Sequence, residues 1–366
     1  MRREPRDDGP VHGSTQSAML ALLGGLALAC VLVVASGADG HSSAAPVTVV
    51  AVSGPVFSVA QDRSRIAWRA CTEVVVRDLA TRKQARFPIA PFPGANPPCR
   101  GQPGHGLAVA GARVVWTEAT SGHKDYLSLA IGTRGGKPHG LGELVNDQYG
   151  EGDSWSDVIA DGETVVQGRV RYARDEACVE ANDGDRFACE AQLVGGGVWR
   201  ILDRSAVRVP QVPPATLVAI AAGRIAVIAY RASGPVIEVR QLRTGALVSR
   251  AEVEGPPRAV AMSQSLVAVL VEDNGTRIVV FDQPTGEIRR TILVPGTTAR
   301  ALVVSDRTVV YRAGSRLWRV DAFAGRPAVA VTARTRPVSF SLEGHRLAWV
   351  ETHRGTSRVR MLLLRG

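Results

Sequence analysis

The chain has 366 residues, of which 45% are apolar and 21% are charged, with 38 Gly and 21 Pro. These values exclude a disordered chain, and the length suffices for one large domain or two ordinary ones. The formal net charge is +10, but only three of the 44 basic residues are Lys, and the arginines are spread along the chain. We therefore interpret the charge as the compositional bias of a GC-rich genome and expect no nucleic-acid partner; attraction to an anionic surface or polymer is the alternative.

The first predicted element is an uncharged apolar segment at residues 18–35, with the sequence AMLALLGGLALACVLVVA. Its length falls between the core of a signal peptide and a minimal membrane span, so it is either a cleaved signal peptide or a retained transmembrane anchor. Three arginines precede it, which predicts that residues 1–17 stay in the cytoplasm. Residues 36–46 are small and polar and form a predicted linker.

Beyond the linker, a short apolar run recurs seven times. The runs are RIAW (65–68), RVVW (113–116), ETVV (163–166), RIAV (224–227), LVAV (266–269), RTVV (307–310) and RLAW (346–349). Successive runs start 39 to 61 residues apart, a period typical of repeat folds.

Each repeat is predicted to hold four short strands, because an alternating Val-rich segment precedes each core run and further strand-like segments follow it after turns. The core runs have no polar side, as expected for a strand that is covered on both faces. One four-stranded unit cannot bury both of its faces alone, so the units must close into a ring. The sequence therefore predicts an all-β fold, a seven-bladed β-propeller over residues 47–366.

The last repeat supplies only three predicted strands. Residues 47–53, with the sequence VTVVAVS, have strand character and directly precede the first strand of the first repeat. We expect this N-terminal strand to complete the last blade and lock the ring, which would remove an exposed sheet edge.

The D-x-x-T-G turn in IVVFDQPTGE (278–287) and the alternating strand, turn and RIAW pattern resemble bacterial TolB-like and WD-repeat-like propeller repeats. The resemblance covers most of residues 47–366 and implies a propeller. The Trp-Asp pair of WD repeats does not occur in the sequence, so an intracellular scaffold is not implied.

Four cysteines lie beyond the export segment, where oxidation is permitted. In an antiparallel meander, the turn between the second and third strands lies at the same end of the blade as the connection to the next blade. This parity places Cys71 and Cys99 at one end of the ring, where we predict a disulfide. Cys178 and Cys189 bracket an acidic insertion at residues 173–190 in the third blade, and a second disulfide is predicted across its base.

The same end of the ring should carry the candidate binding residues, because loops on a rigid scaffold often carry function. These are His105, His123, Tyr149, Asp153, Trp155, Tyr172, Asp183 and Asp185. The oxygen donors of the insertion lack the spacing of a calcium loop, and no nucleophile, zinc or phosphate-binding motif occurs, so we expect no catalytic residues, no metal and no cofactor.

These features predict an exported or membrane-anchored propeller that acts as a monomeric binding module in the cell envelope. Its partner would be a protein, peptide or glycan, with membrane contact through residues 18–35 if that segment is not cleaved. A propeller-fold hydrolase or lyase with an unrecognised active site is the alternative, because catalytic residues scattered over several blades leave no local motif.

Overall fold

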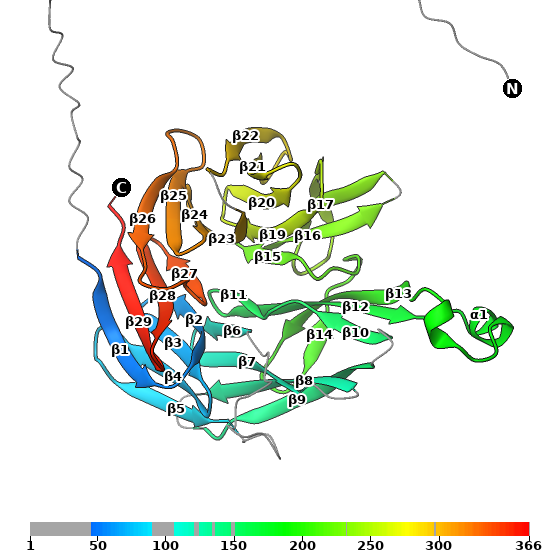
Figure 1. The fold of residues 1–366 in the computed structure, drawn as a ribbon, viewed down its shortest axis with the longest axis horizontal. Coiled ribbons are helices and arrows are strands. Elements are labelled where there is room, and N and C mark those ends of the chain that lie inside the picture. The colour runs from blue at the N-terminus through cyan, green and yellow to red at the C-terminus, as the bar shows by residue number, and fades with distance from the viewer. Residues whose placement is uncertain are drawn as a thin grey trace, which may run out of the picture. The chain divides into compact units, whose positions relative to one another are not determined.

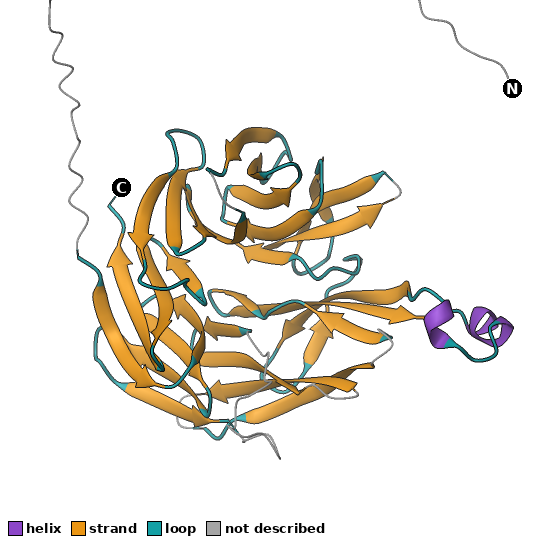
Figure 2. Ribbon diagram, viewed as in Figure 1, coloured by secondary structure: helices purple, strands orange, loops and turns teal. Residues whose placement is uncertain are grey.

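A ring of short antiparallel strands accounts for nearly all of the computed structural model, which describes residues 45–89, 106–120, 124–133, 136–147, 151–231, 233–295 and 298–365. Figure 1 shows the first strand of every blade around a common centre, and Figure 2 shows that helix is confined to one projecting segment. Strands β2 to β5, β15 to β18, β19 to β22 and β23 to β26 each form a four-stranded sheet. The predicted all-β seven-bladed propeller is therefore confirmed. The predicted export segment lies outside the described residues.

The strands follow the chain blade by blade. Blade one contains β2 (Val56–Asp62), β3 (Arg65–Ala70), β4 (Glu73–Asp78) and β5 (Gln84–Pro88); blade two contains β6 (Leu107–Ala110), β7 (Arg113–Thr120), β8 (Lys124–Thr133) and β9 (His139–Asp147). Blade three contains β10 (Gly152–Trp155), β11 (Ile159–Asp161), β12 (Thr164–Ala173), β13 (Gln192–Ile201) and β14 (Ala206–Arg208); blade four contains β15 (Val218–Ala221), β16 (Arg224–Arg231), β17 (Gly234–Gln241) and β18 (Leu247–Glu252). Blade five contains β19 (Pro257–Met262), β20 (Leu266–Glu272), β21 (Thr276–Asp282) and β22 (Ile288–Leu293); blade six contains β23 (Ala299–Ser305), β24 (Thr308–Ala313), β25 (Arg316–Asp321) and β26 (Ala328–Thr332). Blade seven contains β27 (Phe340–Glu343), β28 (Arg346–His353), β29 (Thr356–Leu363) and the N-terminal strand β1 (Val47–Ser53).

The second strand of each blade is buried on both faces, as its apolar run predicted. In β3, Ile66 and Trp68 pack in a cluster with residues of blade seven, while Ala67 between them packs in a cluster with residues of blade two. Successive side chains of a strand point to opposite faces, so each blade contributes to two interblade cores. The stability of one blade therefore depends on both of its neighbours.

The strand register corrects the alignment of two repeats. The first and second strands of blade one are joined by a two-residue turn, with Asp62 paired to Arg65. In blades three and six the corresponding pairs end at Thr164 and Thr308, one residue later than the runs suggest. The structural counterparts of Trp68 are therefore Gln167 and Tyr311, both fully buried, because turn length sets strand register regardless of which residues look alike.

The N-terminal strand β1 closes the ring, as predicted. It pairs antiparallel with β29, from Val47 opposite Met361 to Ser53 opposite Thr356 (Figure 1). Next to this pairing, the fully buried Ser357 hydroxyl accepts a hydrogen bond from Val56 N at 3.0 Å and donates one to Gly54 O at 2.7 Å. The first and last blades are thus joined by the pairing of β1 with β29 and by the two hydrogen bonds of the buried Ser357 hydroxyl.

Carboxylates at the ends of first strands join neighbouring blades at one mouth of the central channel. The pairs are Gly111 N to Asp62 Oδ2 (3.0 Å), Ala222 N to Asp161 Oδ2 (2.8 Å) and Arg63 N to Glu343 Oε1 (3.1 Å). In each pair the acceptor belongs to one blade and the donor to the first turn of the next blade. These acidic groups therefore have a structural role in holding the ring.

Blade three differs from the other blades. Its first strand is split into β10 and β11, which pair with the two halves of the ten-residue strand β12. A further pairing of β10 with β9 merges blades two and three into one nine-stranded sheet. This continuous sheet forms the base from which the insertion of blade three extends.

Candidate functional site: the arm of blade three

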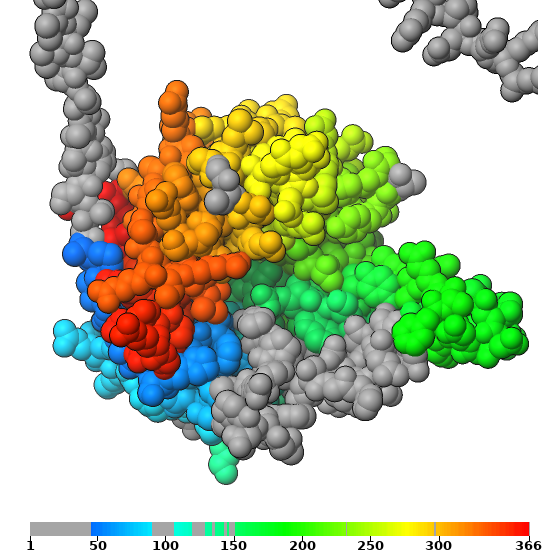
Figure 3. All heavy atoms as spheres, viewed as in Figure 1, coloured from blue at the N-terminus to red at the C-terminus, as the bar shows by residue number. Residues whose placement is uncertain are grey.

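The arm is defined as the distal part of the β12–β13 hairpin with the insertion that joins the two strands, residues 170–196. Because β12 ends at Ala173 and β13 begins at Gln192, the insertion itself spans residues 174–191. It contains a short helix, α1 (Glu176–Ala181), and a 3-10 turn, η1 (Arg186–Ala188). Figures 1 and 3 show that the arm projects beyond the outline of the ring, and it stands away from the channel instead of covering it.

A disulfide closes the insertion. Cys178 and Cys189 are bonded, with their Cα atoms 6.1 Å apart, which confirms the predicted pair. Cys71 is also disulfide-bonded, but its predicted partner Cys99 lies outside the described residues, so that pairing stays a prediction.

Glu151 fixes the base of the insertion. Its Oε1 atom accepts a hydrogen bond from Arg174 N at 2.9 Å, and its Oε2 atom pairs with the Arg186 guanidinium at 2.6 Å. The hydrogen bond from the Arg174 backbone, with that from Arg186, holds the pKa of Glu151 below its usual range in spite of partial burial. Arg186 in turn pairs with Glu176 at 3.0 Å. The chain entering blade three is thereby tied to both ends of the insertion.

The acidic residues of the insertion mainly shape its backbone. Asp175 caps α1 by accepting a hydrogen bond from Ala177 N at 3.0 Å. Asp185, one of the predicted binding residues, caps η1 by accepting one from Phe187 N at 2.9 Å. Asp183 adopts a left-handed conformation, with φ of 54°, in the turn between them. Within the described residues, no group of three or more His, Cys, Asp or Glu side chains could hold a metal ion.

The remaining predicted site residues divide between the two faces of the arm's root. Asp153 and Trp155 in β10 pair with Arg171 and Arg169 of β12, on the face toward blade two. Tyr172 pairs with Gly152, so strand alternation directs its side chain to the opposite face. All of these are partly buried, apart from the exposed Arg171. The other predicted members, His105, His123 and Tyr149, lie outside the described residues.

Exposed apolar side chains on the arm were not predicted. Phe187 is 73% exposed, Val194 is 59% exposed and Leu193 is 49% exposed. Phe187 stands in the polar sequence DGDRFACE, and an isolated aromatic residue in such a loop is the signal that could have identified it. The projecting, braced arm thus carries three exposed apolar side chains.

The central channel of the ring also holds a cavity. Its cavity of about 380 Å³ is lined by the first strands of all seven blades, mostly with small apolar side chains.

In the part of the chain that the structure describes, no helix is long and apolar enough to cross a membrane.

The chain resembles known proteins only in fold. No protein-family model matches it, and no curated protein matches its sequence. A chain of a mitotic checkpoint complex is similar over 86% of this chain and 91% of its own, with a TM-score of 0.52 and 10% identity. The chain is also similar to the computationally designed protein Ika8, with a TM-score of 0.49 and 13% identity over 85% of this chain and 98% of that chain. Its similarity to BamB from Moraxella catarrhalis has a TM-score of 0.46 and 9% identity over 84% of this chain and 85% of that chain.

The seven-bladed ring, together with the likeness to the chain of the mitotic checkpoint complex, defines the fold as a β-propeller. The resemblance to TolB-like and WD-repeat-like repeats is confirmed at the level of the fold, and at such identities no family assignment follows from it.

The disulfide should stabilise the insertion without stabilising the ring. In the chain-entropy model, a bridge between residues 11 apart contributes roughly 3 kcal/mol. We expect the double variant Cys178→Ser/Cys189→Ser to speed hydrogen exchange in residues 175–190 by on the order of a hundredfold, with exchange in β16 and β20 unchanged. Mass spectrometry of amide exchange measures both regions at once, and equal acceleration in the ring would contradict local stabilisation.

Proposed function

We propose that this protein is an extracytoplasmic binding module whose arm docks a partner protein. The observation that carries the proposal is the exposed apolar surface of Phe187, Leu193 and Val194 on an element braced by the disulfide and by Glu151. Exposed apolar side chains on a projecting element are typical of an interaction site. Bracing supports the same proposal, because an ordered arm loses less conformational entropy on binding.

Charge narrows the class of partner. The insertion contains six acidic residues (Asp175, Glu176, Glu180, Asp183, Asp185 and Glu190) and two arginines, a net charge of −4. The rest of the chain therefore carries a formal charge of +14, since the whole chain carries +10. A complementary surface would hold an apolar patch edged by Lys or Arg, which favours a protein over a neutral glycan. The predicted export segment and the disulfide of the insertion support a location in an oxidising compartment.

Site-specific photo-cross-linking tests the proposal. A benzoyl-phenylalanine introduced at Phe187 or at Leu193, in the full chain expressed in its own cell envelope, should give the same discrete cross-linked protein. The control position is Leu293 in β22, which is 75% exposed but lies on the ring. Identical products from Leu293, or products only from cytoplasmic proteins, would contradict the proposal.

A further inference from the structure

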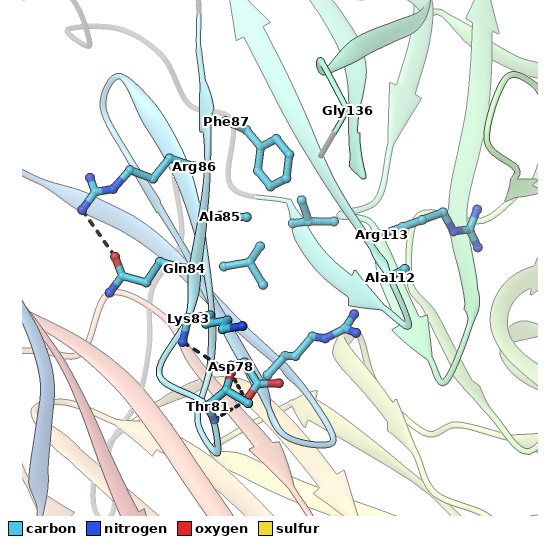
Figure 4. A pocket seen from close by; sticks show the side chains of 13 residues that line it. Asp78, Thr81, Lys83, Gln84, Ala85, Arg86, Phe87, Ala112, Arg113 and Gly136 are labelled. Carbon is cyan, nitrogen blue, oxygen red and sulfur yellow. Dashed lines mark hydrogen bonds between the residues drawn. The ribbon is translucent and has the colours of Figure 1, made fainter. Parts of the chain in front are cut away.

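A second site lies at the opposite end of the blades from the turn that carries the arm. It is a groove of about 710 Å³ between blades one and two, bounded by β4 and β5 on one side and by the start of β7 on the other (Figure 4). We name it the interblade groove. Its volume is within the range of small-molecule sites.

The floor of the interblade groove is apolar and firmly packed. Val76, Ala85 and Val114 line it together with Phe87, which is only 4% exposed. The Phe87 ring packs against Gly132, where an added Cβ would come within 2.7 Å of the ring. This floor belongs to the core between blades one and two, so it is a preformed surface.

Four basic side chains line the groove, and two of them are already engaged. Arg86 pairs with Glu73 at 2.7 Å, and Arg113 pairs with Asp203 of blade three at 3.1 Å. Figure 4 shows the Arg113 guanidinium directed away from the groove. By contrast, the side chains of Arg65 and Lys83 form no ion pair or hydrogen bond with any residue that the structure describes.

The one carboxylate in the lining, Asp78, already accepts hydrogen bonds from its own turn and from the β2–β3 turn. Its Oδ1 atom accepts hydrogen bonds from Ala80 N at 3.0 Å and from Thr81 N at 2.8 Å, and Ser64 Oγ donates to Oδ2 at 3.3 Å. The hydrogen bond from Thr81 N is the largest cause that holds the pKa of Asp78 below its usual range. The groove therefore has a positive balance of charge.

Comparison with other blades shows that Arg65 is used differently. Arginines at the same strand position reach the next blade: Arg346 Nε donates to Gln61 Oε1 at 2.6 Å, and Arg224 Nη1 donates to Gln283 Oε1 at 2.5 Å. Between blades five and six, Arg290 donates to Ala324 O at 2.6 Å and so holds the outer turn of blade six against blade five. Across the described residues, Arg65 makes no such contact and instead lines the groove.

We propose that the interblade groove binds an amphipathic anion, a small molecule that joins a carboxylate or phosphate group to a short apolar body. Arg65 and Lys83 would pair with the anionic group, and the floor around Phe87 would bury the apolar body. Charge-assisted hydrogen bonds to two cations supply orientation, while the apolar floor rejects a purely ionic ligand. This site is separate from the arm and does not depend on the proposed function.

Calorimetric titration with octanoate, octyl phosphate, octanol and inorganic phosphate tests the proposal. Octanoate or octyl phosphate should bind at least about tenfold more tightly than octanol and than inorganic phosphate. The stronger of the two amphipathic anions identifies the preferred headgroup, and either order supports the proposal. Equal binding of octanol, or no binding of either amphipathic anion, would overturn it.

Variants locate the binding. Lys83→Gln and Arg65→Gln should each weaken the anion by about fivefold to tenfold and leave octanol unaffected. The matched control is Arg243→Gln, which removes an exposed charge from the corresponding outer turn of blade four. Ala85→Leu, which adds bulk to the floor and keeps every charge, should also weaken binding. Unchanged affinity in all three groove variants would place the ligand elsewhere and overturn the assignment.

Discussion

A chain without β1 should lose a large part of its stability. Comparing residues 54–366 with residues 45–366, we expect a decrease of at least about 4 kcal/mol in the free energy of unfolding, from three partly buried valines and the lost backbone hydrogen bonds. The valines are Val49, Val50 and Val52, which pack on the core between blades seven and one. Domain stabilities are commonly about 5 to 15 kcal/mol, so this loss is a large fraction of the total. Guanidinium unfolding followed by tryptophan fluorescence measures it.

The exposed edge of β29 should also make the shortened chain self-associate, which size-exclusion chromatography detects. A synthetic peptide of residues 45–55, added in excess, should restore the unfolding midpoint because the missing strand can pair in trans. A peptide of the same composition in scrambled order is the control. If both chains unfolded at the same denaturant concentration, β1 would have no part in closing the ring.

Replacing Glu238 should cause a large loss of stability. This side chain is fully buried in β17, and its carboxylate pairs with Arg231 at 2.7 Å and with Arg240 and Arg250 at 2.8 Å. Only Arg240 is mostly buried, whereas Arg231 and Arg250 are about half exposed. Removing Glu238 therefore leaves one buried charge without a counterion and should cost about 3 kcal/mol, the lower end of the range for buried pairs. We therefore expect Glu238→Ala to lower the unfolding free energy by about this amount.

An exposed ion pair provides the matched control for Glu238. Glu272 pairs with Arg258 at 2.8 Å, but both side chains are substantially exposed. Water screens such a pair, so Glu272→Ala should cost less than about 1 kcal/mol. Equal losses in the two variants, measured by denaturant unfolding, would show that burial does not set the energy of the Glu238 pairs.

The effect of Glu238→Ala should depend on pH. Burial raises the pKa of Glu238, but hydrogen bonds from Arg231 and Arg240 outweigh burial and leave the pKa below its usual value of 4.5. A carboxylate with a depressed folded-state pKa stabilises the protein above its unfolded-state pKa, and this stabilisation is lost as the pH falls through the folded-state value. The difference between the unfolding free energies of the two proteins should therefore be full near pH 7 and decrease as the pH falls below 4.5. A constant difference over this range would contradict the pairing.

The seven blades could be predicted because their determinants are local. Runs such as RIAW at 65–68 indicate a strand that is covered on both faces. The last repeat has only three predicted strands, so the strand-like sequence VTVVAVS at residues 47–53 was expected to supply the fourth. The disulfide between Cys178 and Cys189 could likewise be predicted from the sequence, since the two residues flank one insertion. The sequence did not predict that Gln167 and Tyr311 are the structural counterparts of Trp68, one residue later than the apolar runs suggest. The strand register depends on turn lengths that only the structure shows.

The residues that build the candidate sites depended on contacts between distant segments. Glu151 reaches Arg186 across 35 residues, and Arg113 reaches Asp203 across 90. Neither contact leaves a periodic pattern in the chain, so sequence reasoning selected nearby polar residues such as Asp185, which instead caps a turn.

The sequence alone determined the class of fold, the number of blades and the strand that closes the ring, because alternation of apolar residues and repeat length are properties of the chain itself. Only the tertiary structure decided which charges are already paired and which remain available. That difference separates Arg113 from Arg65, which occupy the same position in successive repeats. The physical reason is that a side chain's partner is set by the neighbouring blade, which its own repeat does not encode.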